Sequence, residues 1–336
     1  MARSRNTADT QTASGGPVSP SIAGKNAVIN GGMDIWQRGT STAIGASGSY
    51  SPDRWFTAVG GASICTVSRQ VTGDTTNLPN IQYCARVQRN SGATSTTAIQ
   101  FSQSIETVNS IPLVNQTVTF SFYARRGANY SSASNALVMQ LQTGTGTDQN
   151  ILVGYTGQAV PIGISQTLTT TWQRFTGTAT ISTTANEVGL NIYYIPTGTA
   201  GANDYFEITG VQLELGSVAT PFSRAGGTIQ GELAACQRYC QNLANLWLTA
   251  IYIGGGINGN YSTELRFPVP MRTTPTATYT DSQSVSNKIT TYTNAAAVNN
   301  VTATVSLGST GLTISTSGNN GYLIMNPYNM IVSAEL

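Results

Sequence analysis

The aromatic side chains are the residues of this sequence whose chemistry is easiest to interpret, because their flat faces can stack on the C–H surfaces of sugars. The chain has four tryptophans and 15 tyrosines. Trp36 and Trp55 stand in glycine-rich phrases where a core position is expected. Trp172 opens an expected strand and is a candidate ligand contact. Four tyrosines near expected turns are further candidates, because loop tips commonly carry recognition residues: Tyr252, Tyr261, Tyr279 and Tyr292.

Covalent chemistry is less favoured. The chain has no histidine, which excludes Ser-His and Cys-His nucleophile systems and every His-ligated metal site. Glycan hydrolysis needs a pair of carboxylates, but the 14 acidic residues are scattered and no motif sets such a pair. We therefore expect no enzymatic activity. The cysteines are too few and too widely spread for a disulfide framework, and we expect them reduced and buried: Cys65, Cys84, Cys236 and Cys240.

The composition predicts a polar but almost uncharged surface. Charged residues make up 9% of the chain, and 16 basic residues nearly balance 14 acidic ones. This balance offers no basic patch for nucleic acid. No apolar run approaches the ~20 residues of a membrane helix, and residues 1–20 lack the apolar core of a signal peptide. We expect neither nucleic-acid binding nor membrane insertion.

The elements that must position any binding residues are mainly strands. Between residues 26 and 224, short alternating segments are separated by Gly, Asn and Thr turns, which favours an all-β fold, a jelly-roll β-sandwich. Two phrases flank this region: NAVINGGMDIWQRG from Asn26 to Gly39, and VQLELGSVATPFSR from Val211 to Arg224. Each contains an alternating segment that predicts a strand at an edge of the domain, and we expect the two to lie side by side.

The pattern changes after Gly227. Thr228 is placed to cap a helix, and apolar or small residues then recur in steps of four and three, which predicts a helical stripe: Ile229, Leu233, Cys236, Cys240, Leu243 and Trp247. A helix this short has little stability alone. We therefore expect its stripe to be covered either by the chain's own sheet or by neighbouring subunits. Residues 225–248 are thus a candidate for self-association of the chain. Residues 249–336 are again strand-like and predict a second small β-domain.

The N-terminal residues 1–25 are rich in Ser, Thr, Ala, Gly and Pro, with almost no large apolar side chain. They cannot bury enough surface to fold alone. They form either a disordered tail or a flexible arm that lies in a groove on another protein, with Val18 and Ile22 as the anchors.

Five phrases, in this order, resemble a family of bacteriophage tail-fibre and related virion proteins with a carbohydrate-binding-like module: INGGMDIWQRGT, SPDRW, VQLELGSVATPF, LAACQRYCQ and RFPVPMRTTPT. They span residues 26–276 in outline. The resemblance implies a virion component at the particle surface, a homotrimer that touches the host envelope. Its implied partners are further copies of itself, a second virion protein that holds the arm, and a host surface glycan.

The NGGMD segment and the closing FEITGVQLE are also similar to the first and last strands of carbohydrate-binding modules built on a galactose-binding jelly roll. In those modules an acid after the NG turn helps to hold a structural calcium, and Asp34 matches that position. Calcium takes six to eight oxygens, so the alternative is that Asp34 pairs with Arg38 or caps a turn. No other cofactor is expected. Asp53 and Arg54 are expected to form a local ion pair or to orient the strand.

Residues and resemblance together predict a structural and adhesive virion protein, a trimeric tail fibre that binds a host glycan without catalysis. A capsid-surface fibre or decoration protein is the alternative, because the same modules could hang from the head. A glycan depolymerase is disfavoured by the scattered acids.

Overall fold

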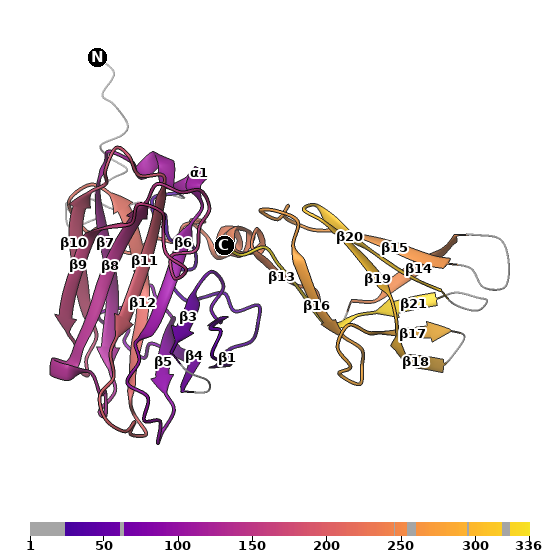
Figure 1. The fold of residues 1–336 in the computed structure, drawn as a ribbon, viewed down its shortest axis with the longest axis horizontal. Coiled ribbons are helices and arrows are strands. Elements are labelled where there is room, and N and C mark those ends of the chain that lie inside the picture. The colour runs from indigo at the N-terminus through magenta and orange to yellow at the C-terminus, as the bar shows by residue number, and fades with distance from the viewer. Residues whose placement is uncertain (1–23, 61–63, 245, 254–259, 294–295, 318–322) are drawn as a thin grey trace, which may run out of the picture. The chain divides into compact units, whose positions relative to one another are not determined.

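The computed structural model describes residues 24–60, 64–244, 246–253, 260–293, 296–317 and 323–336. They form two compact units: the first ends at Leu233 and includes Leu336, and the second is Ala234–Glu335 (Figure 1). The division falls inside the segment that was expected to link two β-domains. In the part of the chain that the structure describes, no helix is long and apolar enough to cross a membrane.

The first unit is a jelly-roll β-sandwich of two six-stranded antiparallel sheets, as predicted. The first sheet has the order β1 (Ser41–Ile44), β4 (Cys65–Val71), β5 (Tyr83–Arg89), β12 (Tyr205–Leu215), β7 (Thr117–Arg126) and β10 (Gln173–Thr180). The second has the order β2 (Ser49–Tyr50), β3 (Phe56–Val59), β6 (Ile99–Ile105), β11 (Glu187–Tyr194), β8 (Ala136–Gly144) and β9 (Ala159–Thr167). Short helical segments lie in the connections: α1 (Thr107–Ser110), η2 (Ile111–Leu113) and η3 (Ala133–Asn135).

The core of the first unit lies between the sheets, because alternate side chains of each strand point inward. Phe120 and Phe122 of β7 are fully buried there. Trp55 stacks flat on Phe101, with ring centroids 4.7 Å apart and 3° between the ring planes. Trp36 is also buried in this core. Trp36 and Trp55 are therefore core residues, as expected from the sequence.

The two flanking phrases lie side by side, as predicted. Ala27 N donates to Leu213 O, and Val211 N donates to Gly31 O, each over 2.9 Å. These bonds cross from the start of the first unit to its last strand, β12. The sandwich is thus closed by residues nearly two hundred positions apart in the chain.

Asn26 reinforces this closure with its side chain. Its amide donates to Val211 O and to Ser223 O, both at 3.0 Å. Its Oδ1 accepts from Leu213 N at 3.0 Å. Asn26 is 2% exposed, so these bonds form away from water, where an unpaired amide would be costly.

The first phrase is not the strand that its alternation predicted. Asn30 and Met33 have φ of 57° and 55°, in the left-handed region, and the segment folds as successive turns. The buried side chain of Asn30 holds these turns: it donates to Ile35 O at 2.8 Å and to Asp53 O at 3.0 Å. The strand prediction was wrong because a buried polar side chain pairs with the main chain that a sheet neighbour would otherwise satisfy.

The close approach of the phrases requires a glycine. A Cβ on Gly31 would lie 2.0 Å from Val211 O. We expect Gly31→Ala to lower the free energy of unfolding of the first unit by roughly 3 kcal/mol, because main chain must move to admit the methyl group. Denaturant titration measures this loss. Gly45→Ala is the control, since a Cβ there meets nothing within 4 Å; equal stability of the two variants would contradict the close approach.

The second unit is the expected second β-domain. Its three-stranded sheet has the order β13 (Cys240–Asn242), β22 (Tyr328–Ser333) and β16 (Thr276–Thr280). Its seven-stranded sheet has the order β18 (Ala296–Val301), β17 (Ile289–Thr293), β21 (Leu323–Asn326), β14 (Leu248–Ile253), β15 (Asn260–Arg266), β20 (Gly311–Ser317) and β19 (Thr304–Gly308). A separate hydrophobic core includes Ile289, Ile314 and Met325.

Helix α2 (Ile229–Gln237) is shorter than the predicted helix. Thr228 caps it as expected, since Gly231 N donates to the Thr228 hydroxyl at 3.1 Å. Cys240 then begins β13, which pairs with β22. The prediction of one helix through Trp247 was wrong, because the main chain after α2 finds its hydrogen-bond partners in a sheet.

The predicted helical stripe is therefore divided. Ile229 and Leu233 lie one turn apart on α2 and are 42% and 36% exposed, and Trp247 is 56% exposed. The other three members are buried or packed inside: Cys236, Cys240 and Leu243. No continuous apolar stripe remains for a trimer seam; only the pair Ile229 and Leu233 stays available on the helix.

None of the four cysteines forms a disulfide, and all four are buried, as predicted. Burial raises the pKa of the Cys65 thiol to about 12. This thiol is therefore protonated at neutral pH and packs as a small apolar group.

Asp281 organises a loop of the second unit. Its carboxylate is 1% exposed and accepts hydrogen bonds from the main-chain N–H groups of Gln283 (2.9 Å), Val285 (2.8 Å) and Asn300 (2.7 Å). Burial alone would raise the pKa of the Asp281 carboxyl, but the three donors outweigh it and hold this pKa below its usual value.

A carboxyl with a lowered native pKa stabilises the fold only while it is ionised. We therefore expect the second unit to lose stability as the pH falls from about 3.9, the usual aspartate pKa, through the native pKa. Asp281→Asn should lower the melting temperature at neutral pH and flatten this acid dependence, because its NH₂ group would face the N–H of Asn300. Calorimetry from neutral pH to about pH 2 measures both effects. The exposed Glu264 supplies the control variant, Glu264→Gln; the same acid dependence in all three proteins would refute the role of Asp281.

Candidate functional site

Trp172, a candidate ligand contact from the sequence, is buried and offers no exposed platform. It is 7% exposed, and its indole N–H donates to Thr72 O at 3.1 Å. The Arg125 guanidinium lies 4.7 Å from its ring centroid. The ring packs in a small cluster with three other side chains: Leu78, Ile81 and Cys84. The prediction failed because the sequence gave no sign that the loop between β4 and β5 packs on this ring.

The four distal tyrosines have different surroundings. Tyr261 is 3% exposed and belongs to the core of the second unit, which rules it out as a stacking surface. Tyr279 is half-buried, and burial raises the pKa of its hydroxyl. Tyr292 is half-buried and contacts Trp247. Tyr252 belongs to β14, but its side chain lies outside the described residues.

Asp34 pairs with Arg224, not with Arg38, and its surroundings do not fit a calcium ion. Arg224 Nε donates to Asp34 Oδ2 at 2.8 Å. Calcium takes six to eight oxygen ligands. Among the described residues, no group of three or more His, Cys, Asp or Glu side chains could hold a metal ion. A guanidinium in direct contact would also repel a bound cation, so the geometry favours a structural ion pair.

The SPDRW phrase is built into the framework. Asp53, fully buried, accepts from Gln37 N at 2.9 Å and lies 3.9 Å from a guanidinium nitrogen of Arg38. Arg54 has φ of 72° and donates to Ser104 O at 2.5 Å. Both side chains therefore join the turn to neighbouring elements of the first unit.

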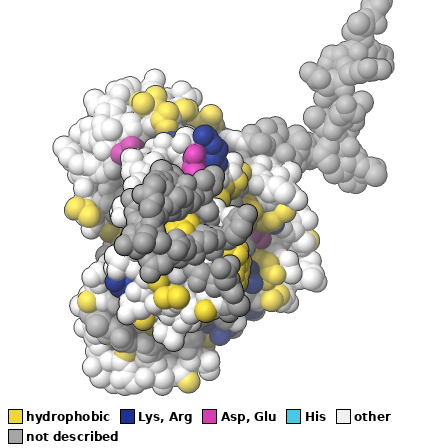
Figure 2. Space-filling model, turned by 90° about the vertical axis from the view of Figure 1, so that its right-hand side faces the viewer, with side chains coloured by type: hydrophobic (Ala, Val, Ile, Leu, Met, Phe, Trp, Pro, Cys, Tyr) yellow, Lys and Arg dark blue, Asp and Glu magenta, His cyan; other side chains and the backbone are white. Residues whose placement is uncertain are grey.

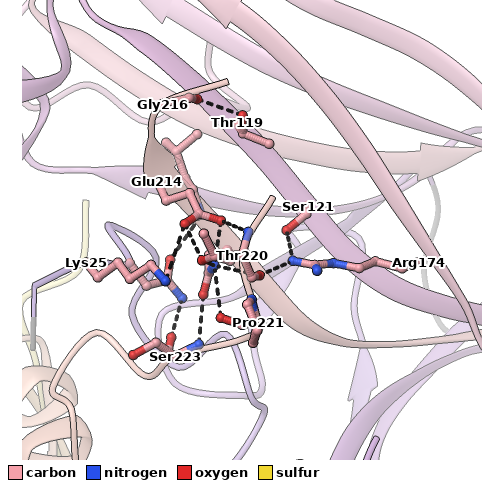
Figure 3. Close-up of polar contacts among 12 residues, drawn as sticks. Lys25, Thr119, Ser121, Arg174, Glu214, Gly216, Thr220, Pro221 and Ser223 are labelled. Carbon is pink, nitrogen blue, oxygen red and sulfur yellow. Dashed lines mark hydrogen bonds and ion pairs between the residues drawn. The ribbon is translucent and has the colours of Figure 1, made fainter. Parts of the chain in front are cut away.

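The second flanking phrase forms a polar network of its own (Figure 3). Glu214 is 2% exposed and accepts from Gln212 Nε2 at 2.7 Å and from the Thr220 hydroxyl at 2.5 Å. Lys25 Nζ lies 3.7 Å from the same carboxylate. Arg174 lies on β10, the edge strand of the same sheet, and donates to Thr220 O. Most of these groups bond to one another, so the network helps the phrase to close the sandwich.

The outer face of the first sheet carries a buried carboxylate between two guanidinium groups. Arg86 donates to Glu207 Oε1 at 2.6 Å, and Arg125 donates to Glu207 Oε2 at 2.6 Å. The two guanidinium groups lie over the rings of Tyr205 and Trp172, 4.1 Å and 4.7 Å from the ring centroids. Glu207 is fully buried, so this arrangement neutralises a carboxylate that would otherwise be costly to bury.

The outer face of the second sheet is the best candidate for ligand contact. Core residues such as Phe101, Met139 and Leu190 point inward, so their neighbours along each strand point outward. The register places these outward residues in cross-strand rows, with Phe56, Ser102, Asn191 and Gln140 in one row and Gln100, Tyr193 and Val138 in the next. We define the amide face as Gln100, Ser102, Gln140, Gln142, Asn191 and Tyr193.

Side-chain amides on this face are joined to one another. Asn191 Nδ2 donates to Gln100 Oε1 at 3.0 Å, and Gln142 Nε2 donates to Gln140 Oε1 at 2.7 Å. Asn191 is 4% exposed, and its Oδ1 has no hydrogen-bond partner in the described structure. A buried acceptor without a partner costs about 1–3 kcal/mol. A donor supplied by a ligand would recover part of this energy.

Aromatic rings border the amides. Tyr193 is half-buried on the amide face, whereas Tyr194 points into the core and contacts Tyr130, with centroids 4.7 Å apart. Only one tyrosine of this pair faces outward, because side chains alternate along a strand. Phe56 is half-buried at the edge of the same face. Neutral donors, neutral acceptors and ring surface therefore meet on one sheet, which suits a polyhydroxylated, uncharged ligand.

The amide face was not singled out from the sequence, although its signal is present there. The segment ALVMQLQTG alternates so that Gln140 and Gln142 share one side of β8, and EVGLNIYYIP places Asn191 and Tyr193 on one side of β11. What the sequence does not show is that these two strands are neighbours. The pairing of β8 with β11 supplies that information.

No family model matches the chain, and no curated protein matches it. Among solved structures, the enzymatically active domain of tailspike protein 4 of bacteriophage CBA120 is similar at 14% identity, over 57% of this chain and 21% of that chain, with a TM-score of 0.36. A CBM4 module is similar at 19% identity, over 56% of this chain and 98% of that chain, with a TM-score of 0.32. The CBM22-1 xylan-binding domain from Paenibacillus barcinonensis is similar at 14% identity, over 59% of this chain and 98% of that chain, with a TM-score of 0.33.

Proposed function

We propose that this protein is a non-catalytic adhesive component of a bacteriophage particle, and that its first unit binds a host surface glycan through the amide face. The observation that carries the proposal is the row of side-chain amides with an unpaired buried acceptor on Asn191, beside the ring of Tyr193. Sugar hydroxyls donate and accept hydrogen bonds, and an amide offers both in return. The C–H face of a sugar packs on an aromatic ring.

The low charge of the chain favours a neutral glycan. None of the six residues of the amide face is charged. On the face of the molecule drawn in Figure 2, few Lys, Arg, Asp and Glu side chains are seen. An acidic polysaccharide would be held by arginine and lysine side chains, whereas Arg86 and Arg125 are already engaged by Glu207.

The proposed place in the virion rests on the five sequence phrases. Three copies would present their β-units outward, and a partner virion protein would hold residues 1–25. The anchors Val18 and Ile22 lie outside the described residues and stay predictions. Trimerisation would raise the avidity of weak sugar sites by roughly 10²–10⁴-fold. Attachment to the tail is the proposal, and a fibre or decoration protein on the head is its alternative.

The amide face can be tested with variants that spare the core. We expect Tyr193→Ala and Gln140→Ala each to weaken retention of the full chain on a glycan by about fivefold, because a sugar stack or an amide contact is worth about 1 kcal/mol. Binding is measured on immobilised neutral polysaccharides and bacterial surface polysaccharides. Thr176→Ala, exposed on the first sheet, is the control and should bind as the wild type does.

Two results would contradict the proposal. One is unchanged retention in both amide-face variants, or no retention of the wild type on any of these polysaccharides. The other is release of reducing ends during incubation, since that would make the protein a depolymerase. Melting temperatures of all variants establish that they are folded.

The trimer is tested through the helix residues that the structure leaves exposed. We expect Ile229→Asp with Leu233→Asp to reduce the mass from three times 35.2 kDa to that of one chain, because two carboxylates would be desolvated in a subunit contact. Light scattering measures the mass. Val153→Asp, at a side chain that is 87% exposed, is the control. A wild-type mass of one chain would reject the trimer.

A further inference from the structure

Trp247 is the one tryptophan of the chain that is open to solvent. Its side chain is 56% exposed, while the other three are at most 8% exposed: Trp36, Trp55 and Trp172. The others have a clear structural role in the first unit. Trp247 belongs to the second unit, and it is not a member of the hydrophobic core that the described residues of this unit form. An exposed indole is a large apolar surface for water to cover, so its position calls for a functional explanation.

Trp247 forms a pair with Tyr292. Their ring centroids are 4.8 Å apart, and the ring planes make an angle of 35°. Leu248, which follows Trp247, is buried and pairs with Met325 across β14 and β21. Met325 in turn pairs with Thr291 of β17. Because side chains alternate along strands, Tyr292 points away from this buried row. The aromatic pair therefore lies on the outward side of the seven-stranded sheet.

Polar groups without charge lie next to this pair. Thr290, two residues before Tyr292 on the same side of β17, has its hydroxyl 3.0 Å from the Ser282 hydroxyl and 2.8 Å from Asn299 Oδ1. The Ser282 hydroxyl is 2.7 Å from the same Asn299 oxygen. Ser282 is exposed and Asn299 is half-buried. A small network of hydroxyl and amide groups thus begins two residues along the strand from Tyr292.

Asn326 adds a second observation on the same side of the sheet. It pairs with Thr290 across β17 and β21, is fully buried, and has no hydrogen-bond partner in the described structure at either amide atom. Two unpaired amide atoms make this part of the sheet a place where added donors and acceptors, from a ligand or from water that a ligand orders, are favourable.

Charged groups do not shape this surface. Between residues 273 and 334 the chain has two charged residues, Asp281 and Lys288. The Asp281 carboxylate is bound by main-chain N–H groups, and Lys288 Nζ lies 2.7 Å from the Thr302 hydroxyl. Rings beside neutral hydroxyl and amide groups match the two surfaces of a neutral sugar, one of C–H bonds and one of hydroxyls.

We propose that Trp247 and Tyr292, with Ser282 and Asn299, form a second sugar-binding site, the distal aromatic site. A neutral sugar ring stacks on the indole, and its hydroxyls exchange hydrogen bonds with Ser282 and Asn299. A second copy of the chain is the weaker occupant on size: two aromatic side chains bury at most about 300–500 Å², whereas a stable interface buries about 800 Å² on each partner. The site deepens the proposed glycan binding but is independent of the amide face.

The full chain is titrated with free neutral sugars: D-glucose, D-galactose, D-mannose, N-acetyl-D-glucosamine and their short oligomers. We expect at least one of them to change the tryptophan emission saturably, because Trp247 is the exposed indole. Tyr292→Ser keeps the indole and should weaken the affinity read from this response about fivefold, as expected for the loss of a ring contact worth about 1 kcal/mol. Saturation-transfer NMR on the sugar gives a readout that does not need the indole. By that readout Trp247→Ala should lose the sugar signal and Trp247→Phe should retain part of it.

Tyr193→Ala is the matched control, because it alters the amide face and leaves the distal aromatic site intact. It should keep the full emission response. The inference is overturned if no sugar gives a response, or if Trp247→Ala retains the NMR signal. It is also overturned if Trp247→Ala lowers the mass in light scattering, since the indole would then serve a contact between copies. If only the amide face failed, Tyr193→Ala would retain polysaccharide as the wild type does, and sugar would still change the emission of Trp247. The two failures are therefore distinguishable.

Discussion

The closure of the first unit depends on buried polar side chains that join its two ends. The Asn26 side chain donates to Val211 O and accepts from Leu213 N. Glu232, fully buried at the start of α2, accepts from Asn30 N and from Gly226 N at 2.7 Å. Burial raises the pKa of the Glu232 carboxyl, although these two main-chain donors oppose the rise. Loss of either side chain would leave several main-chain groups unpaired in the interior, which costs more than the bonds themselves contribute. The close approach of Gly31 to Val211 O and the turns around Asn30 are part of this closure.

The use of polar side chains inside the fold also explains why the exterior carries little charge. Charges are scarce in this chain, and several of them are held inside: Asp204 with Arg89 at 3.3 Å, Glu207 between two arginines, and Glu214 near Lys25. Each buried carboxylate has a cation or N–H donors, as burial requires. Amides, hydroxyls and rings are left to cover the outside. The amide face and the distal aromatic site are both made of such groups.

The sequence predicted what local pattern controls and missed what depends on distant neighbours. Strand alternation predicted the sandwich and the second β-domain, and the Thr228 hydroxyl caps α2 as expected. The helix through Trp247 was wrong because β22, some ninety residues later, pairs with the segment that begins at Cys240. Trp172 was misplaced because the loop that contacts it is remote in sequence. The amide face needed the pairing of β8 with β11, which no single-strand pattern contains.

Dissolved salt screens attractions between exposed charges beyond about 10 Å at 0.1 M ionic strength. The contacts expected of the amide face are dipolar and dispersive, and such contacts act at short range, where ions do not intervene. Attachment through this face would then hold in dilute fresh water and in brine alike, and it would gain no long-range guidance toward a charged cell. The protein would meet the cell surface by diffusion alone. The lifetime of the bound state would depend on the number of contacts formed.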